Sequence, residues 1–294
     1  MQKIILFYKF TPINDTKAIL LWQKSLATQY NLKGRIIIAD HGINGTLAGN
    51  IDDLKKYIKE FKTYPNFKKT VFKWSEGNQA DFPRLSVKVR PEIVSFGVAN
   101  KIKVNGQGII GGGQHLKPEE VNDLVKKHGN DVIFFDGRNK FEASIGRFKD
   151  AIIPQVEHSR DFPKELKNKK YEKIKDKPIV TYCAGGVRCE VITKLMKDEG
   201  FKEVYQIDGG IVKYGEKYKD KGLWEGKLFV FDKRMDIKFS DQAKDIARCT
   251  NCNSKTSNYE NCLNKSCNKL ILLCIQCARN NKLYCQNCKL ALAV

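Results

Sequence analysis

The sequence predicts an α/β protein with an α+β N-terminal domain, a parallel-sheet α/β domain and a small cysteine-rich C-terminal segment. The chain has 294 residues, which at about 100–200 residues per domain suggests two domains. Two series of strand-like and helix-like patterns flank a glycine-rich stretch, and eight of the ten cysteines lie between Cys249 and Cys288. We therefore divide the chain into four parts: residues 1–96, a linker at 97–114, a second domain at 115–228 and an extension at 229–294.

The first domain alternates strand and helix patterns. A helix is predicted at 15–31, with Asp15 or Thr16 near its N-cap. A second, amphipathic helix is predicted at 51–65, because Leu54, Ile58 and Phe61 recur at near-helical spacing before Pro65 stops the helix. Apolar strands are expected at 4–10, 34–40, 46–49, 71–76 and 85–94. This β-α-β-β-α-β order resembles a ferredoxin-like or acylphosphatase-like unit, a fold that hosts many functions and identifies none.

The stretch from Gly97 to Gly113 is rich in glycine and is the best candidate for a linker. Its last residues, Gly111-Gly112-Gly113, also suggest a loop that cradles phosphate. Such a loop requires a strand-to-helix frame and a lysine at a set spacing. Neither follows here, so we favour the linker.

The second domain begins with a helix at Lys117-Pro118 that ends near Gly129. Strands are predicted around 131–138, 177–182 and 204–207, and a helix capped by Gly200 precedes the last of them. Strands that alternate with helices form a parallel sheet covered on both faces. Such sheets bind ligands at the carboxyl ends of their strands.

The segment Cys183-Ala-Gly-Gly-Val-Arg188 lies between an apolar strand and a helix. Backbone N–H groups in such a loop, together with the helix N-terminus, lower the pKa of a thiol and stabilise an anion. The two glycines allow a tight curl, and Arg188 adds a fixed positive charge. The pattern favours a reactive Cys183 over a buried structural cysteine.

Residues from about 115 to 225 resemble a rhodanese domain. The matching features are the Cys183 loop, Gly200-Phe201, Gly209-Gly210-Ile211, Ala151-Ile-Ile-Pro154, and Asp136-Gly-Arg138-Asn139 with Glu142 beyond it. The resemblance implies that Cys183 carries a persulfide and that Arg188 helps to hold an anionic ligand, with Asp136 and Arg138 as auxiliary residues. Four residues separate Cys183 from Arg188, as in sulfurtransferases. Related phosphatases have one residue more, which leaves phosphatase as a minor alternative.

Other motifs are similar to those of the TrhO/YceA family of bacterial tRNA uridine hydroxylases. They are Phe7-Tyr8-Lys9-Phe10, Gly34-Arg35-Ile36, Gly42-Ile-Asn-Gly-Thr46, Lys88-Val-Arg-Pro-Glu-Ile-Val94, Arg188-Cys189-Glu190 and the cysteine-rich tail. The resemblance implies oxygen-dependent formation of 5-hydroxyuridine at the wobble position of tRNA, with molecular oxygen as co-substrate. It leaves the electron donor open, and no flavin or nicotinamide fingerprint is recognised.

We expect Cys183 to add to C6 of uracil and so to activate C5. Cys189 either resolves an oxidised Cys183 or packs under the helix. The histidines, at positions 41, 115, 128 and 158, are scattered, and we interpret each as surface or structural. Two other functions remain open: a sulfurtransferase with persulfide sulfur on Cys183, and a non-catalytic RNA-binding protein, which the intact Cys183 and Arg188 argue against.

The tail contains four pairs of cysteines, three of them spaced Cys-x2-Cys and one Cys-x4-Cys. Such pairs present two thiolates to one tetrahedral zinc ion. Eight thiolates would fill two structural sites, whose pairing is either sequential or crossed, and the metal would supply folding energy to a segment with little core. Disulfides or free thiols are the alternative. The predicted zinc ligands are Cys249, Cys252, Cys262, Cys267, Cys274, Cys277, Cys285 and Cys288.

The formal net charge is +20, and the excess is spread over all parts of the chain. Positive charge favours a polyanionic partner, although a lysine-rich surface alone would have the same composition. With the family resemblance, the expected partner is tRNA, bound by the first and third parts of the chain. There is no run of about 18 apolar residues and no long apolar leader, so we expect a cytoplasmic protein without a membrane span.

Overall fold

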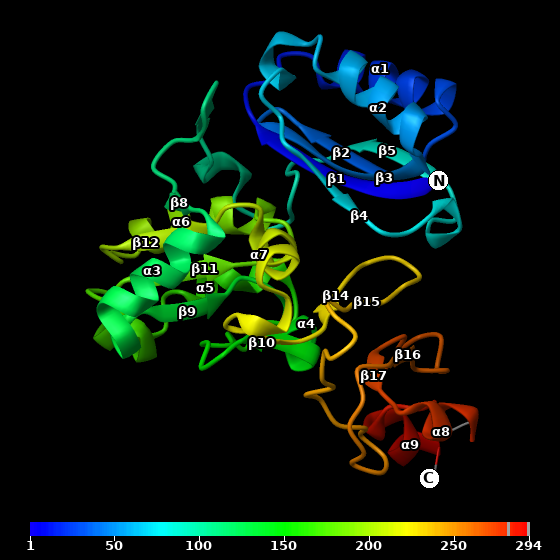
Figure 1. Cartoon of the computed structure of the whole chain (residues 1–294), viewed down its shortest axis with the longest axis vertical. Helices are drawn as coiled ribbons and strands as arrows, with labels where there is room; N and C mark the ends of the chain where they lie inside the picture. Colours follow the sequence, from blue (N-terminus) through cyan, green and yellow to red (C-terminus); the bar gives the residue numbers. More distant parts are fainter. Residues whose placement is uncertain (281–282, 293–294) are drawn as a thin grey trace.

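The computed structural model describes residues 1–280 and 283–292. It consists of an N-terminal sheet covered by two helices, a parallel sheet with helices on both faces, and an extension that ends in the cysteine-rich tail (Figure 1). Within the described residues, none of the helices combines the length and apolar character needed to cross a membrane.

The N-terminal domain has a five-stranded sheet in the order β4-β1-β3-β2-β5. All neighbouring pairs are antiparallel except β2 and β5, which are parallel. Helices α1 and α2 lie on one face (Figure 1). This arrangement confirms the expected α+β unit, and the strand expected at 85–94 is the edge strand β5, which ends at Val89. The elements are β1 (Gln2–Phe10), α1 (Thr16–Gln29), β2 (Lys33–Ala39), β3 (Gly42–Asn50), α2 (Ile51–Phe61), β4 (Phe72–Ser75) and β5 (Leu85–Val89).

Local chemistry explains where these elements begin and end. Asp15 caps α1 by accepting a hydrogen bond from the backbone N–H of Ala18 at 2.9 Å. Helix α2 ends at Phe61, before Pro65. Strand β3 is longer than its glycine-rich sequence predicts. Its Gly45 is required because a Cβ atom there would lie 2.4 Å from Cζ of Phe7.

The second face of the N-terminal sheet packs against the second domain. Phe10, Ala39 and Phe96 belong to the same buried cluster as Phe135 and Ile192 of the second domain. The two domains therefore share one hydrophobic core, and the face of the first sheet that lacks helices is fixed over the second sheet.

Residues 97–114 connect the domains through short ordered elements. A 3-10 turn at Ala99–Lys101 is followed by a two-stranded ribbon, β6 (Val104–Asn105) and β7 (Gly108–Ile109). The three glycines end beside helix α6 (Val187–Asp198), and a Cβ atom at Gly113 would lie 2.8 Å from the side chain of Thr193.

The second domain has a four-stranded parallel sheet in the order β8-β12-β11-β9. Helix α6 packs in the core shared with the first domain, whereas α3 and α7 pack on the other face. The elements are β8 (Gln114–Leu116), α3 (Pro118–His128), β9 (Ile133–Asp136), α4 (Lys140–Ile145), β10 (Gly146–Phe148), α5 (Phe162–Glu165), β11 (Ile179–Tyr182), α6 (Val187–Asp198), β12 (Val204–Ile207), α7 (Gly210–Tyr218) and β13 (Trp224–Gly226).

The extension first crosses back to the N-terminal domain and then forms the tail. Between β14 and β15, the backbone carbonyl of Phe231 accepts a hydrogen bond from Arg35 at 3.1 Å, and Arg234 donates to Ser75 at 3.1 Å. The elements here are β14 (Leu228–Phe229), β15 (Asp236–Ile237), β16 (Tyr259–Asn261), β17 (Leu270–Leu272), α8 (Ile275–Arg279) and α9 (Gln286–Leu292).

Candidate active site

A cavity of about 400 Å³ lies where the two domains and the extension meet. The second domain contributes the Cys183 loop, and the first contributes polar side chains of the sheet face that lacks helices. Phe231, from the extension, is 51% exposed at this cavity. The lining residues that the later argument uses are Tyr8, Lys73, Asn139, Cys183, Arg188 and Phe231.

The loop wraps around the sulfur of Cys183. The thiol follows β11, is fully buried, and accepts a hydrogen bond from the backbone N–H of Gly186 at 3.2 Å. Gly186 has a φ of +98°, in the left-handed region that favours glycine. Gly210 approaches the loop so closely that a Cβ atom there would lie 2.4 Å from the carbonyl oxygen of Cys183.

This environment makes Cys183 a thiolate at neutral pH. Burial by itself would raise the pKa of the thiol. A hydrogen bond from Cys189, the charge of Arg188 and backbone hydrogen bonds outweigh burial and lower the pKa of Cys183 to about 5. Burial, followed by the contact with Cys183, instead raises the pKa of Cys189 well above its ordinary value. Cys189 is therefore a neutral thiol that donates to a charged one.

Two side chains of the N-terminal domain reach the loop. The ammonium of Lys73 donates to the carbonyl oxygen of Gly185 and lies 4.8 Å from the ring centroid of Tyr8. Burial lowers the pKa of Lys73 to about 8, and the neighbouring Cys183 thiolate acts in the opposite direction. Tyr8 belongs to one of the family-like motifs, but the local sequence does not indicate that Tyr8 or Lys73 reaches Cys183, because only the docking of the first domain brings them there.

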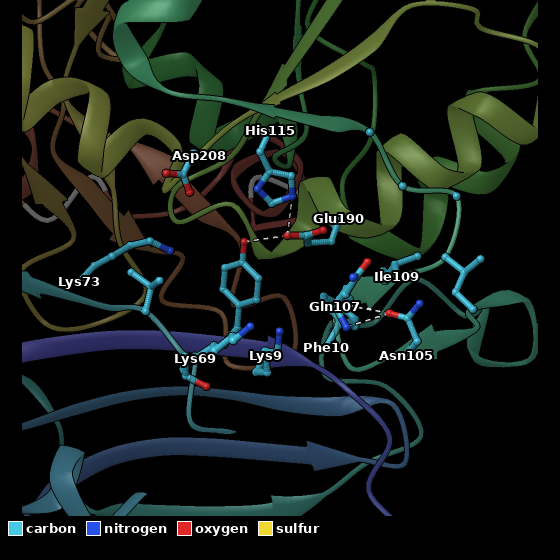
Figure 2. Close-up of a pocket in the computed structure, with 18 residues that line it drawn as sticks. Lys9, Phe10, Lys69, Lys73, Asn105, Gln107, Ile109, His115, Glu190 and Asp208 are labelled. Carbon is cyan, nitrogen blue, oxygen red and sulfur yellow. Dashed lines mark hydrogen bonds and ion pairs between the residues drawn. The ribbon is translucent and has the colours of Figure 1, made fainter. Parts of the chain in front are cut away.

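Glu190, in the first turn of α6, joins Tyr8 to a histidine. The Tyr8 hydroxyl donates to its carboxylate at 3.0 Å, and Nε2 of His115 lies 3.2 Å from the same carboxylate oxygen. Figure 2 shows His115 and Glu190 facing each other. The hydrogen bond with Glu190 raises the pKa of His115. His115 therefore belongs to a network beside the loop, a position that sequence reasoning did not assign to it.

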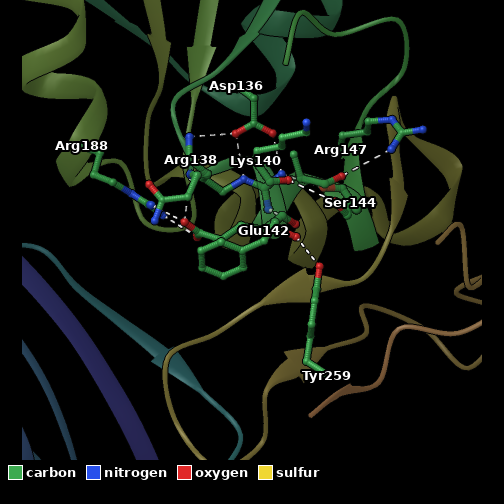
Figure 3. Close-up of polar contacts among 12 residues, drawn as sticks. Asp136, Arg138, Lys140, Glu142, Ser144, Arg147, Arg188 and Tyr259 are labelled. Atoms are coloured by element: carbon green, nitrogen blue, oxygen red, sulfur yellow. Dashed lines mark hydrogen bonds and ion pairs between the residues drawn. The ribbon is translucent and has the colours of Figure 1, made fainter. Parts of the chain in front are cut away.

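Arg188 is fixed by Glu142 of α4. Its two terminal nitrogens donate to the two carboxylate oxygens at 2.6 and 2.8 Å, and Glu142 is fully buried (Figure 3). The arginine thus presents its charge to Cys183 while its fork holds a protein carboxylate.

Asp136 and Arg138 form a buried pair that supports α4. Arg138 donates to Asp136 at 2.9 and 2.6 Å and to the carbonyl oxygen of Gly146 at 2.6 Å (Figure 3). Both side chains are fully buried, and neither lines the Cys183 cavity. Their geometry fixes the two ends of α4, and with them the position of Glu142.

The eight tail cysteines form two groups of four with crossed pairing. Within each group the sulfur atoms lie within 4.8 Å of one another. Tetrahedral zinc with Zn–S bonds of about 2.3 Å separates its sulfur ligands by about 3.8 Å. The measured separations include 3.5 Å and 3.7 Å. The donor sets therefore fit zinc; they are Cys249, Cys252, Cys274 and Cys277 in one group and Cys262, Cys267, Cys285 and Cys288 in the other.

The tail contacts the helix that carries Glu142. The hydroxyl of Tyr259 donates to the carbonyl oxygen of Phe141 at 2.6 Å, and Figure 3 shows Tyr259 reaching up to α4. The rings of Tyr259 and Phe141 both pack with Phe229. A chain of contacts therefore runs from the tail through α4 to Arg188 and the Cys183 loop.

Three family models match consecutive parts of the chain. The UPF0176 acylphosphatase-like domain matches residues 2–93, the rhodanese-like domain matches 117–217, and the rhodanase C-terminal domain matches 225–289. Among solved structures, the rhodanese-like domain from Anabaena sp. is 16% identical, covering 38% of this chain and 78% of that one, with a TM-score of 0.32.

Curated relatives match almost the whole chain. The tRNA uridine(34) hydroxylase of Corynebacterium urealyticum is 58% identical over 287 residues, 98% of this chain and 97% of the relative. The protein of the same name from Rhodococcus opacus is 57% identical over 280 residues, 95% of this chain and 98% of the relative. The chain belongs to the family of tRNA uridine(34) hydroxylases.

Proposed function

We propose that this protein hydroxylates uridine 34, the wobble nucleotide of tRNA, and that Cys183 is the nucleophile. The observation that carries the proposal is a thiol with a pKa of about 5 that lines an interdomain cavity. A wobble base must leave its stack to react, and a cavity of about 400 Å³ accommodates one base. Such a substrate implies a cytoplasmic enzyme that uses its N-terminal domain and extension to bind tRNA.

The chemistry begins with addition of the Cys183 thiolate to C6 of uracil. The new C–S bond turns the C4–C5–C6 system into an enolate, whose nucleophilic carbon is C5. The external donor reduces O₂ by two electrons to the peroxide level, and C5 attacks one oxygen atom of this peroxide. The C5–O bond forms as the O–O bond breaks, and the second oxygen atom leaves as water. Loss of the C5 proton and departure of the thiolate restore the ring. Overall, uridine, O₂, two electrons and two protons give 5-hydroxyuridine and water, with the electrons supplied by an external donor.

Other residues of the cavity are suited to hold the base. The side-chain oxygen of Asn139 is buried without a hydrogen-bond partner among the described residues, so it can accept from N3–H of uracil. The exposed ring of Phe231 offers a stacking surface. The Lys73 ammonium, beside Gly185, offers positive charge to the enolate.

Incubation of unmodified tRNA with the protein, a reductant and air, followed by mass spectrometry of the nucleosides, tests the proposal. The wild type is expected to form 5-hydroxyuridine and Cys183→Ser to form none, because a neutral hydroxyl does not add to C6. Full activity of Cys183→Ser would refute the role of the thiolate. Formation of thiolated uridine or thiocyanate would indicate sulfur transfer instead, and tight binding of unchanged tRNA would indicate a non-catalytic protein.

We also propose that each group of four tail cysteines holds a structural zinc ion. Four thiolates form a closed site, which supports folding and leaves no position for a substrate. Elemental analysis of protein purified without chelators is expected to give about two zinc ions per chain. Fewer than one would defeat the two-site assignment.

A further inference from the structure

A second cavity of about 490 Å³ lies on the other side of Tyr8 from the Cys183 cavity. Strand β1 and residues 69–73 form one wall, and the β6–β7 ribbon with the glycines after it forms the other. Figure 2 shows Lys9 and Lys69 side by side on the first wall, with Asn105 and Gln107 on the ribbon.

The lysines of this cavity lack acidic partners. The side-chain ammonium groups of Lys9 and Lys69 make no hydrogen bond or ion pair with the part of the chain that the structure describes. Burial is the largest effect and lowers the pKa of Lys9. Attraction to Glu190 raises this pKa and repulsion from Lys69 lowers it, so that it lies below its ordinary value. Two ammonium groups that repel each other at a cavity wall favour an anion between them.

The two carboxylates that line the cavity, Glu190 and Asp208, already have other partners. Glu190 accepts one hydrogen bond from Tyr8 and lies against His115, whose pKa this contact raises. Asp208 pairs with Lys213. The positive charge of Lys9 and Lys69 is therefore available to a ligand.

The ribbon adds groups that recognise the edge of a base. The side-chain oxygen of Asn105 accepts from the backbone N–H groups of Gln107 and Gly108 at 2.8 and 3.2 Å, which leaves its amide N–H groups free to donate. The Gln107 side chain is exposed, and its amide both donates and accepts. Two ammonium groups thus face amide groups that can pair with the edge of a base, across a cavity of about 490 Å³.

The two cavities share only Tyr8 and Lys73 among their lining residues. The two cavities therefore adjoin at Tyr8 and Lys73, which form their common wall. Consecutive nucleotides of a single strand would occupy the two cavities with their backbone passing over this wall.

We propose that the second cavity binds the nucleotide adjacent to the target uridine, with the intervening phosphate between Lys9 and Lys69 and the base against the β6–β7 ribbon. This inference rests on the proposed function, since it takes the RNA strand as the ligand. It makes the second cavity a determinant of which anticodon loops the enzyme accepts.

A binding cycle tests the inference. Affinity is measured for an anticodon stem-loop with native phosphates and for versions with a neutral methylphosphonate 5′ or 3′ of nucleotide 34. The proteins are the wild type, Lys9→Ala/Lys69→Ala and the matched control Lys17→Ala/Lys24→Ala, which removes two exposed charges from α1. For the wild type, one methylphosphonate is expected to weaken binding about tenfold.

The Lys9→Ala/Lys69→Ala protein is expected to bind native RNA at least tenfold more weakly and to lose nothing further with that methylphosphonate. Its salt dependence should also fall by about 0.7 per lost phosphate contact. The control should behave as the wild type. The inference would be overturned if the methylphosphonate weakened binding to the Lys9→Ala/Lys69→Ala protein as much as binding to the wild type. Equal affinity of the wild type for all three RNAs would also overturn it. Hydroxylation of native RNA by the wild type reports on the proposed function separately.

Gln107→Ala tests the base-reading part. Its kcat is expected to stay near that of the wild type, while KM changes by a different factor for each base next to uridine 34. A uniform change in KM for all four bases would refute base recognition by the ribbon. Thermal melting of each variant, compared with the wild type, confirms that it is folded.

Discussion

Arg188 and Glu142, 46 residues apart in the chain, meet through two parallel hydrogen bonds of 2.6 and 2.8 Å at the base of the Cys183 loop. The pair joins α6, the helix after the loop, to α4. Arg138, paired with Asp136, donates to the carbonyl oxygen of Gly146 at the end of α4. Bidentate pairs of this kind fix both charge and orientation. Arg188 therefore contributes a charge of fixed position to the thiolate.

Glu142→Gln is expected to remove the charge partner of Arg188, since the Glu142 carboxylate is fully buried and pairs with it. Leaving one member of a buried ion pair unpaired costs about 3 kcal/mol or more in the free energy of unfolding. Because Arg188 also gains freedom to leave the loop, kcat/KM should fall more than tenfold. Chemical denaturation and 5-hydroxyuridine formation measure the two effects. The exposed Glu225→Gln, as control, should change neither, and a Glu142→Gln protein of wild-type stability would contradict this account.

The sequence could predict the Cys183 loop because its chemistry is contiguous. A strand, two glycines, an arginine and a helix within about ten residues determine the local backbone and the thiolate environment. Three of the four strands of the parallel sheet and the N-terminal α+β unit also followed from local hydrophobic periodicity, with element ends shifted by a few residues. Strand β8, at the edge of the parallel sheet, was not predicted.

The parts that could not be predicted depend on tertiary packing. Tyr8 and Lys73 belong to another domain, and only the shared hydrophobic core brings them to the loop. His115 has no local pattern that separates it from a surface histidine. In the tail, the spacing of the cysteines gave eight candidate ligands, whereas the crossed pairing depends on how β16 and β17 bring distant pairs together.

The pH dependence of kcat/KM should be bell-shaped. Cys183, with a pKa of about 5, must be deprotonated, so activity falls as the pH drops toward 5. Lys73, with its pKa lowered by burial to about 8, must stay charged, so activity falls as the pH rises through 8. In Lys73→Gln the alkaline limb should disappear and the plateau should be lower. In Lys73→Arg the limb should move to higher pH, and an unchanged limb in that variant would assign it to another group.

Removal of metal from the tail should slow catalysis, because the tail contacts α4, the helix that carries Glu142. A chelator is expected to release about two zinc ions, as measured with a colorimetric indicator. Loss of tail structure would break the hydrogen bond from Tyr259 to Phe141 and loosen the helix that holds Glu142. Tyr259→Phe tests that bond alone and should cost about 1 kcal/mol of stability, with a smaller loss of activity than metal removal. Full activity of metal-free protein would show that the tail does not support the site.

The role of Cys189 can be decided by two substitutions that differ in one hydrogen bond. The structure makes Cys189 a neutral donor to the Cys183 thiolate, because burial and the contact with Cys183 raise its own pKa. Cys189→Ala removes the donor, so the pKa of Cys183 should rise and the acid limb of kcat/KM should move to higher pH, with activity recovered at alkaline pH. Cys189→Ser keeps an O–H donor and should retain the wild-type limb. A residue that resolves an oxidised Cys183 must form a disulfide, which serine cannot do. Loss of multiple turnovers in both variants at every pH would therefore establish the resolving role and refute the donor role.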